Sequence, residues 1–170
     1  MKTDSDKLIV GSNELIEVAG IKGIPAKIDT GADTSSIWAS NINMETDVTL
    51  VFSLFDTKSP LYTGELLRTK DYRVKSVRSS HGDTQIRYRV KLPITIKNMS
   101  LETSFTLSNR SRNRFPVLIG RHTLEGRFIV DVSQSVIPNK PVEKSKKLSQ
   151  ELAKDPYKFH QKYLIDEEEK

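Results

Sequence analysis

The chain has 170 residues, 36% of them hydrophobic and 29% charged, a balance typical of one globular domain with an appendage. It contains no cysteine, which excludes disulfide bonds and thiolate metal sites. The formal net charge of +5 indicates an anionic partner. Because the basic stretches carry few aromatic residues and no recognition-helix or zinc-finger motif, we do not expect that partner to be nucleic acid.

The N-terminal segment and the hydropathy of the chain bear on where the protein resides. Residues 1–10 include two aspartates and lack the apolar core of a signal peptide. No run of about 18 apolar residues, the length that a membrane span requires, occurs in the sequence. We therefore expect a cytoplasmic protein with no membrane partner.

Short segments rich in β-branched and aromatic residues follow one another as far as residue 137. Turns that contain Gly, Asn or Asp separate them. The clearest segments are Leu8–Val10, Ala26–Ile28, Val48–Phe55, Gln85–Val90, Ile94–Ile96, Ser104–Leu107 and Phe128–Val130. Many short strands with frequent turns predict a mainly β domain over residues 1–137, either a small barrel or a sandwich.

The composition changes near the C-terminus. Residues 138–147, PNKPVEKSKK, are rich in Pro and Lys and are typical of a linker. Beyond them, Ser149 can cap one short helix, and Asp155 followed by Pro156 is a typical start of a second helix. We therefore predict a linker and a helical C-terminal extension over residues 138–170, either packed on the β domain or frayed.

The stretch AKIDTGADTSSIWA, residues 26–39, places an ionisable carboxylate in a turn of small residues. One interpretation is that Asp29 only forms the turn beside Gly31. The other is that Asp29 is a catalytic acid, with Thr30 bonding back to lock the loop and Gly31 allowing close backbone approach. Two such carboxylates held close together share one proton, and the pair can activate water while protonating a peptide carbonyl.

A second apolar segment, Phe115–Gly120, lies far downstream and ends in glycine. It has the composition of a strand that crosses behind the Asp29 loop and braces it. Arg121 follows directly and is the natural partner for Asp33, because a partly buried Asp–Arg pair would orient the loop. The alternative is that Asp33 and Arg121 are unrelated surface charges. We predict that Asp33, Gly120 and Arg121 support the site structurally.

The segment RSSHGDT, residues 78–84, has the features of a hairpin tip. An aspartic protease needs a mobile hairpin that closes over the extended substrate, so this segment is the candidate flap. The alternative is that the basic strand after this segment is an ordinary solvated strand, whose charges discourage pairing with another sheet edge. The predicted substrate-binding residues are Arg78, Ser79, Ser80, His81, Gly82, Arg87 and Arg89.

The motifs Asp29-Thr30-Gly31-Ala32-Asp33 and Leu118-Ile119-Gly120-Arg121 together resemble the retropepsin core of retroviral proteases. The sequence is more similar to the bacterial retropepsin-like family often labelled ATP-dependent zinc protease and associated with RimK-type ATP-grasp ligases. The stretches that carry this resemblance are AKIDTGADTSS, VRSSHGDTQIRYRV and TLSNRSRNRFPVLIGRHTLEGRFIVDVSQS. It covers roughly residues 8–133 and implies a single-lobed, closed acid-protease barrel, with Asp29 as the catalytic carboxylate and an ATP-grasp ligase as a functional partner.

The sequence departs from that family at two positions: the family tends to have a basic residue where this chain has Asp33, and a histidine where it has Trp38. The histidines, at positions 81, 122 and 160, lie far apart. No HExxH motif and no glycine-rich ATP loop occurs. We therefore expect no metal site and no cofactor in this chain.

Three classes of function are open at this point. The first is a retropepsin-like aspartic endopeptidase that hydrolyses peptide bonds with water activated by a dyad. The second is a catalytically silent module of the same fold that binds peptides or regulates a partner. The third is a metal-dependent hydrolase or a nucleic-acid binder. A cleavage assay with Asp29→Asn beside the wild type separates the first from the second, and chelators test the metal-dependent case.

Two further expectations follow from the first function. Only one Asp-Ser/Thr-Gly motif occurs, so an active enzyme requires a C2 homodimer with Asp29 of each copy at the two-fold axis. The basic flap and the cluster Arg110, Arg112 and Arg114 indicate an acidic, glutamate-rich peptide or protein substrate. The acidic run at residues 166–169 is either a solubilising tail or a tethered competitor for the same cleft.

Overall fold

A computed structural model describes residues 6–78, 84–138 and 143–164 of the chain. The chain divides into two compact units, residues 1–137 and residues 138–170. In chain order, the described part of the first unit contains β1 (Leu8–Val10), β2 (Asn13–Val18), β3 (Ile21–Ile28), β4 (Ser35–Met44), β5 (Leu50–Leu54), β6 (Leu67–Thr69), β7 (Tyr72–Arg78), β8 (Thr84–Ile96), β9 (Met99–Ser108), β10 (Val117–Ile119), α1 (Arg121–Leu124) and β11 (Phe128–Val130).

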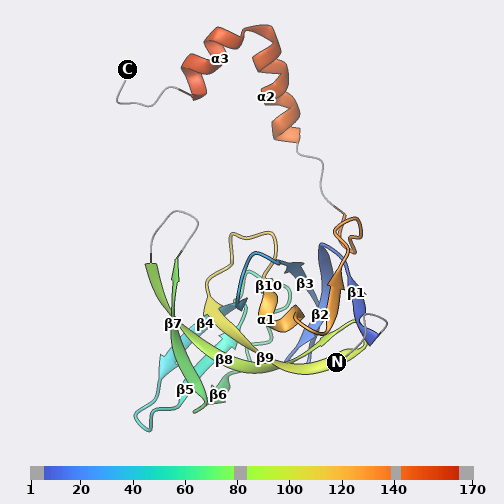
Figure 1. The fold of residues 1–170 in the computed structure, drawn as a ribbon. Helices are drawn as coiled ribbons and strands as arrows, with labels where there is room; N and C mark the ends of the chain where they lie inside the picture. Colours follow the sequence, from blue (N-terminus) through green and yellow to red (C-terminus); the bar gives the residue numbers. More distant parts are fainter. Residues whose placement is uncertain (1–5, 79–83, 139–142, 165–170) are drawn as a thin grey trace. The chain divides into compact units, whose positions relative to one another are not determined.

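Six of these strands form a closed β-barrel (Figure 1). Their order around the barrel is β10-β3-β2-β8-β9-β4, and β10 closes the ring because it pairs with both β3 and β4. The pairs β10–β3 and β4–β9 are parallel. Strands β5 and β6 continue the sheet beyond β4, and β7 pairs with the first half of β8. The predicted mainly β fold is confirmed, and it is a barrel and not a sandwich.

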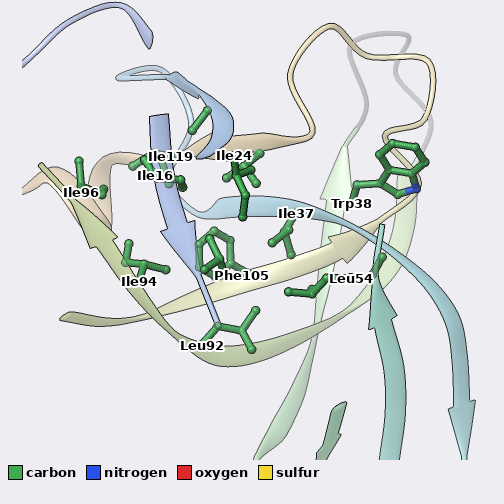
Figure 2. Packing of buried hydrophobic residues seen from close by; sticks show 14 of the residues in the cluster. Ile16, Ile24, Ile37, Trp38, Leu54, Leu92, Ile94, Ile96, Phe105 and Ile119 are labelled. Carbon is green, nitrogen blue, oxygen red and sulfur yellow. The ribbon is translucent and has the colours of Figure 1, made fainter. Parts of the chain in front are cut away.

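The barrel interior is filled by branched and aromatic side chains (Figure 2). Ile24, Ile37, Phe105 and Ile119 are fully buried, and they come from four different strands. Burying one side chain of this size contributes about 1.5–3 kcal/mol relative to leaving it exposed. The core therefore ties β3, β4, β9 and β10 together, and the loop that contains Asp29 connects β3 with β4.

Strand β8 runs without interruption through Pro93, where the sequence suggests two separate strands. β8 pairs with β7 as far as Val90 and with β2 from Ile94 onward. The carbonyl oxygen of Pro93 accepts a hydrogen bond from Ala19 N at 2.9 Å, so this side of Pro93 faces the β2 edge. Proline lacks a backbone N–H, and here that gap lies where the neighbour of β8 changes from β7 to β2. No hydrogen bond between strands is therefore lost at Pro93.

Strands β1 and β11 form a separate two-stranded parallel ribbon. The segment that follows β11 is held on the barrel by the buried side chain of Asn13. Asn13 Nδ2 donates to Ser135 Oγ at 2.8 Å, and Asn13 Oδ1 accepts from Ile137 N at 2.7 Å. Two large side chains of the ribbon, Ile9 and Ile129, are 50% and 40% exposed.

The second unit contains α2 (Glu143–Lys154) and α3 (Pro156–Tyr163). Asp155 caps α3 by accepting a hydrogen bond from Lys158 N at 3.0 Å, as the sequence predicts. The helix predicted to begin at Ser149 instead begins at Glu143, because the Glu- and Lys-rich stretch assigned to the linker is a good helix former. None of the described helices is long and apolar enough to cross a membrane.

Candidate active site

Asp29 lies at the end of β3, in a turn that its own side chain stabilises. Asp29 Oδ1 accepts a hydrogen bond from Gly31 N at 3.0 Å, and Ala32 N donates to the Asp29 carbonyl oxygen at 3.3 Å. The residue is half-buried, whereas Thr30 and Gly31 are exposed. The hydrogen bond from Gly31 restricts the rotation of the Asp29 carboxylate and leaves the tip of the loop open to solvent.

Strand β10 braces this loop from behind, as the sequence predicts for Phe115–Gly120. Asp29 N donates to the Ile119 carbonyl oxygen at 2.9 Å, and Arg121 N donates to the Ala32 carbonyl oxygen at 2.7 Å. Gly120 lies so close to the loop that a β-carbon would be 2.7 Å from the carbonyl carbon of Thr34. The absence of a side chain at Gly120 is therefore what allows the loop and β10 to approach.

A chain of three hydroxyl groups lies under the loop, and sequence reasoning did not identify it. Ser35 Oγ accepts a hydrogen bond from Gly120 N at 3.1 Å and bonds to Thr123 Oγ1 at 2.8 Å. Thr123 Oγ1 also bonds to Thr103 Oγ1 at 2.8 Å. These bonds join β4, α1 and β9. The only sign of this chain in the sequence is Ser35, a small hydroxyl residue at the start of an apolar strand, and such residues are too common to predict it.

Asp33 and Arg121 form an ion pair, the contact that the sequence predicts between them. The side chains are 53% and 60% exposed, so the pair is solvated and not partly buried. The hydrogen bond and the positive charge of Arg121 lower the pKa of the Asp33 carboxyl below its ordinary value, and Lys75 and His122 act in the same direction. Asp33 is therefore held in its ionised form beside the loop.

A cavity of about 380 Å³ lies beside the loop and is lined by residues of the loop, β7, β8, β9 and β10. Its charged lining residues are the cations Lys75, Arg78, Arg87 and Arg110 and the carboxylate of Asp33. Lys75 Nζ donates to Thr34 Oγ1, and Arg110 Nε donates to the Phe115 carbonyl oxygen at 3.1 Å. Burial and the charge of Arg87 lower the pKa of the Arg110 guanidinium, whereas the charge of Asp29 acts in the opposite direction. Arg110 therefore lies within electrostatic range of Asp29.

The predicted flap residues divide into three groups. Arg78 and Arg87 line the cavity beside the loop. Arg89, which shares a strand face with Arg87, lines a different cavity further along β8. The hairpin tip with Ser79, Ser80, His81 and Gly82 lies outside the described residues. Among the residues that are described, no three His, Asp or Glu side chains gather so that they could hold a metal ion.

A single-lobed, closed barrel with Asp29 on a braced loop is consistent with a retropepsin-like fold. A family model described as RimB-like, "Retropepsin-like aspartic endopeptidase RimB", matches residues 9–141. The chain belongs to this RimB-like family, which confirms the resemblance drawn from the Asp29 and Gly120 motifs.

Relatives of known sequence are longer proteins. A protein of Shewanella pealeana named "Probable alpha-L-glutamate ligase" is 30% identical over 135 residues, which are 76% of this chain and 30% of that protein. A protein of Desulfotalea psychrophila with the same name is 29% identical over 136 residues, 77% of this chain and 29% of that protein. The chain thus spans about 30% of the length of the curated relatives it matches.

A solved structure has the same fold. The crystal structure of a Legionella pneumophila protein of unknown function superposes with a TM-score of 0.55 at 23% sequence identity. The match covers 75% of this chain and 95% of that protein. At this identity the likeness supports the barrel architecture and carries no statement about activity.

Proposed function

We propose that this chain is an aspartic endopeptidase in which Asp29 supplies one of two catalytic carboxylates. The observation that carries the proposal is the position of Asp29 on a loop whose backbone is tied to β10, with Asp29 N 2.9 Å from the Ile119 oxygen. A catalytic carboxylate needs this rigidity, because a displacement of about 1 Å can reduce the rate about a hundredfold. The description of the family supports the same activity.

In the proposed mechanism, the Asp29 carboxylates of two copies lie close together and share one proton, because both cannot be ionised at that distance. The ionised carboxylate takes a proton from water while the water oxygen bonds to the peptide carbonyl carbon, and the protonated carboxyl gives its proton to the carbonyl oxygen. The C–N bond of the tetrahedral intermediate then breaks: the amine leaves with a proton from the dyad, and one hydroxyl of the intermediate returns its proton to the dyad. The hydrogen bond from Gly31 N orients Asp29 for these transfers.

The second carboxylate comes, in this proposal, from a second copy of the chain related by a two-fold axis. Three features support this. The sequence contains a single Asp-Ser/Thr-Gly motif. Thr30 and Gly31 are exposed beside Asp29. Thr30 also lines an open cavity of about 550 Å³ together with Arg121 and His122, so there is room beside the loop for side chains of a second copy.

Acidic peptides are the proposed substrate class. Lys75, Arg78, Arg87 and Arg110 line the cavity beside the loop, and guanidinium groups make strong charge-assisted bonds to carboxylates. The names of the longer relatives, alpha-L-glutamate ligases, support a glutamate-rich tail as the physiological substrate. They also support a functional partnership with an ATP-grasp ligase, and thus a cytoplasmic setting in which such a ligase finds ATP.

The direct test compares the wild-type chain with Asp29→Asn in a peptide-library cleavage assay read by mass spectrometry. We expect the wild type to cleave acidic peptides, with a preference that weakens as salt rises, because exposed charges are screened over about 8 Å at physiological ionic strength. Asp29→Asn should fold normally and cleave nothing. Cleavage by Asp29→Asn would assign the chemistry to another acid. If the wild type bound peptides without cleaving them, a catalytically silent module would be supported. Inhibition by chelators would support a metal-dependent hydrolase.

A subunit-mixing experiment tests the dimer separately. Wild-type chain at fixed concentration is titrated with Asp29→Asn chain, under conditions in which subunits exchange. We expect the activity to fall as the inactive chain is added, because a mixed dimer has only one Asp29 carboxylate. Activity that is independent of the added variant would show that each chain is active alone, and would contradict a site shared between two copies.

A further inference from the structure

A second cationic cavity adjoins the cavity beside the loop. It has a volume of about 430 Å³, and Arg89, Lys91, His122 and Arg127 are among the residues that line it. Thr34 lines both cavities, so the two adjoin along β8. Glu102 is the acidic residue in the lining of the second cavity, and it is exposed.

The charges along the β7–β8 hairpin are arranged unfavourably for the protein by itself. In the strand register, Lys75 lies directly opposite Arg87, and Arg73 lies directly opposite Arg89. Like charges directly opposite each other destabilise a sheet. Further along the same face, Lys91 contacts Asp71 with 3.5 Å between Nζ and Oδ2, so opposite charges meet there. The like-charged pairs of the hairpin therefore contain Lys75 and Arg87, which line the first cavity, and Arg89, which lines the second.

These cations have few anionic partners in the protein. In the described part of the chain, Lys75, Arg87 and Arg89 form no ion pair with a carboxylate. Lys75 bonds to the Thr34 hydroxyl, and Arg87 Nη2 bonds to the Gln85 side-chain oxygen at 2.9 Å. Arg127 is oriented by the carbonyl oxygens of His122, Thr123 and Glu125, at 3.3, 3.4 and 3.3 Å from Nη1. These neutral partners orient the cations, and the carboxylate of Asp33, which also lines the first cavity, offsets only part of the positive charge there.

The spacing of the two cavities matches an extended peptide. Arg87 lines the first cavity and Arg89 the second, and both lie on one face of β8 two residues apart. A strand rises about 3.3 Å per residue, so the two Cα atoms are about 7 Å apart along β8. Residues i and i+2 of an extended peptide have the same separation and also project to one side.

We propose that the second cavity is a distal subsite for a carboxylate side chain of the substrate, and that the two cavities together select acidic residues at positions i and i+2 of an extended peptide. This inference rests on the proposed function for the identity of the ligand as a peptide. Arg87 binds one carboxylate, Arg89 binds the other, and Arg127 and His122 also line the distal subsite. Arg89 is thus a specificity-determining residue outside the cavity next to the Asp29 loop.

The test is a binding measurement with the full chain carrying Asp29→Asn, so that no cleavage intervenes. Two fluorescent peptides share one neutral core and the same net charge: in one, Glu residues stand at i and i+2, and in the other at i and i+1. Fluorescence anisotropy gives both dissociation constants. We expect the i, i+2 peptide to bind about tenfold more tightly, the effect of one additional charge-assisted bond at a half-exposed site.

Arg89→Gln and Arg73→Gln form a matched pair of variants in this background. Each removes one positive charge from the same cross-strand pair, but only Arg89 lines the distal cavity. Arg89→Gln should abolish the preference for the i, i+2 peptide. Arg73→Gln should raise the dissociation constants of both peptides by less than about threefold and keep the preference. Equal effects of the two variants, or no preference in the parent chain, would overturn the subsite.

The same measurements separate this inference from the proposed function. The chain could prefer the i, i+2 peptide through Arg89 and yet cleave no peptide when Asp29 is present. That result would support the distal subsite and refute the proposed endopeptidase activity. Cleavage of acidic peptides that does not depend on the spacing of their Glu residues would support the endopeptidase activity and refute the distal subsite. Melting temperatures provide a check on folding, because each variant relieves the repulsion between residues 73 and 89 and should be no less stable than its parent.

Discussion

Replacing Gly120 with alanine tests how tightly β10 braces the Asp29 loop. Gly120 has φ −90° and ψ 174°, a backbone conformation that any residue adopts, so the close packing explains the glycine. A β-carbon there would lie 2.7 Å from the Thr34 carbonyl carbon and 2.8 Å from the Ala32 carbonyl oxygen, whereas ordinary contact begins at 3.4 Å. The loop backbone must therefore move by about 0.7 Å, since the surrounding interior is close-packed.

We expect Gly120→Ala to lower the free energy of unfolding by about 2–3 kcal/mol, the upper range for overpacking a rigid interior. For a domain of this size, the corresponding fall in Tm is about 4–12 °C. Because the displaced atoms belong to the Asp29 loop, kcat/KM should fall about 30-fold, somewhat less than the hundredfold that a 1 Å displacement can cause. Thermal unfolding followed by circular dichroism and peptide hydrolysis measured well below the Tm report the two effects separately.

Gly23→Ala provides the control. Gly23 has φ +68°, and a β-carbon there would meet no atom within 4 Å. Alanine in this left-handed conformation costs about 1–2 kcal/mol without touching the Asp29 loop, so stability should fall while kcat/KM is unchanged. If Gly120→Ala lost stability but kept its activity, or if both variants lost activity equally, β10 would not act as the brace of the loop.

Three further predictions concern residues around the barrel. Thr123→Val should lower the free energy of unfolding by about 1–3 kcal/mol in urea titrations, because it leaves the buried Ser35 hydroxyl one partner short; an unchanged midpoint would show that the hydroxyl chain is not needed. Asn13→Ala should speed amide hydrogen exchange in the segment after β11, and unchanged exchange there would show that Asn13 does not hold it. Because Arg121 lowers the pKa of Asp33, their ion pair stabilises the fold above the ordinary carboxyl pKa and loses that effect as pH falls through the lowered value. Asp33→Asn should therefore lower the Tm at neutral pH but not in strong acid, and a difference that does not vary with pH would contradict this reasoning.

The sequence predicts those parts of the fold that local chemistry determines. The Asp29 turn follows from a small-residue motif, and the β10 brace follows from an apolar run that ends in glycine. The contact between Asp33 and Arg121 follows from their positions beside these two motifs. What the sequence does not reveal depends on pairing between distant strands: β8 continues through Pro93 because its neighbour changes there.

The division of the cationic residues between two cavities has the same origin. Arg87 and Arg89 share a strand face, which the two-residue period of a strand predicts. Which cavity each one lines depends on the approach of Thr34 and α1 to β8, and neither is close to β8 in the sequence. The hydroxyl chain of Ser35, Thr123 and Thr103 likewise joins three segments that only the closed barrel brings together.

The ion pair of Asp33 also bears on which carboxylate completes the proposed dyad. A pair that shares one proton needs two carboxylates whose mutual repulsion raises the pKa of one of them. Asp33 is the acidic residue nearest to Asp29 in the sequence, but the hydrogen bond and charge of Arg121 lower its pKa, and Lys75 and His122 add positive potential. A carboxylate stabilised by Arg121 in this way is a weak acceptor for the proton of the attacking water, and it holds no proton to give to the peptide carbonyl. The proposal therefore takes the second carboxylate from Asp29 of another copy, and subunit mixing, more directly than substitution of Asp33, tests the composition of the site.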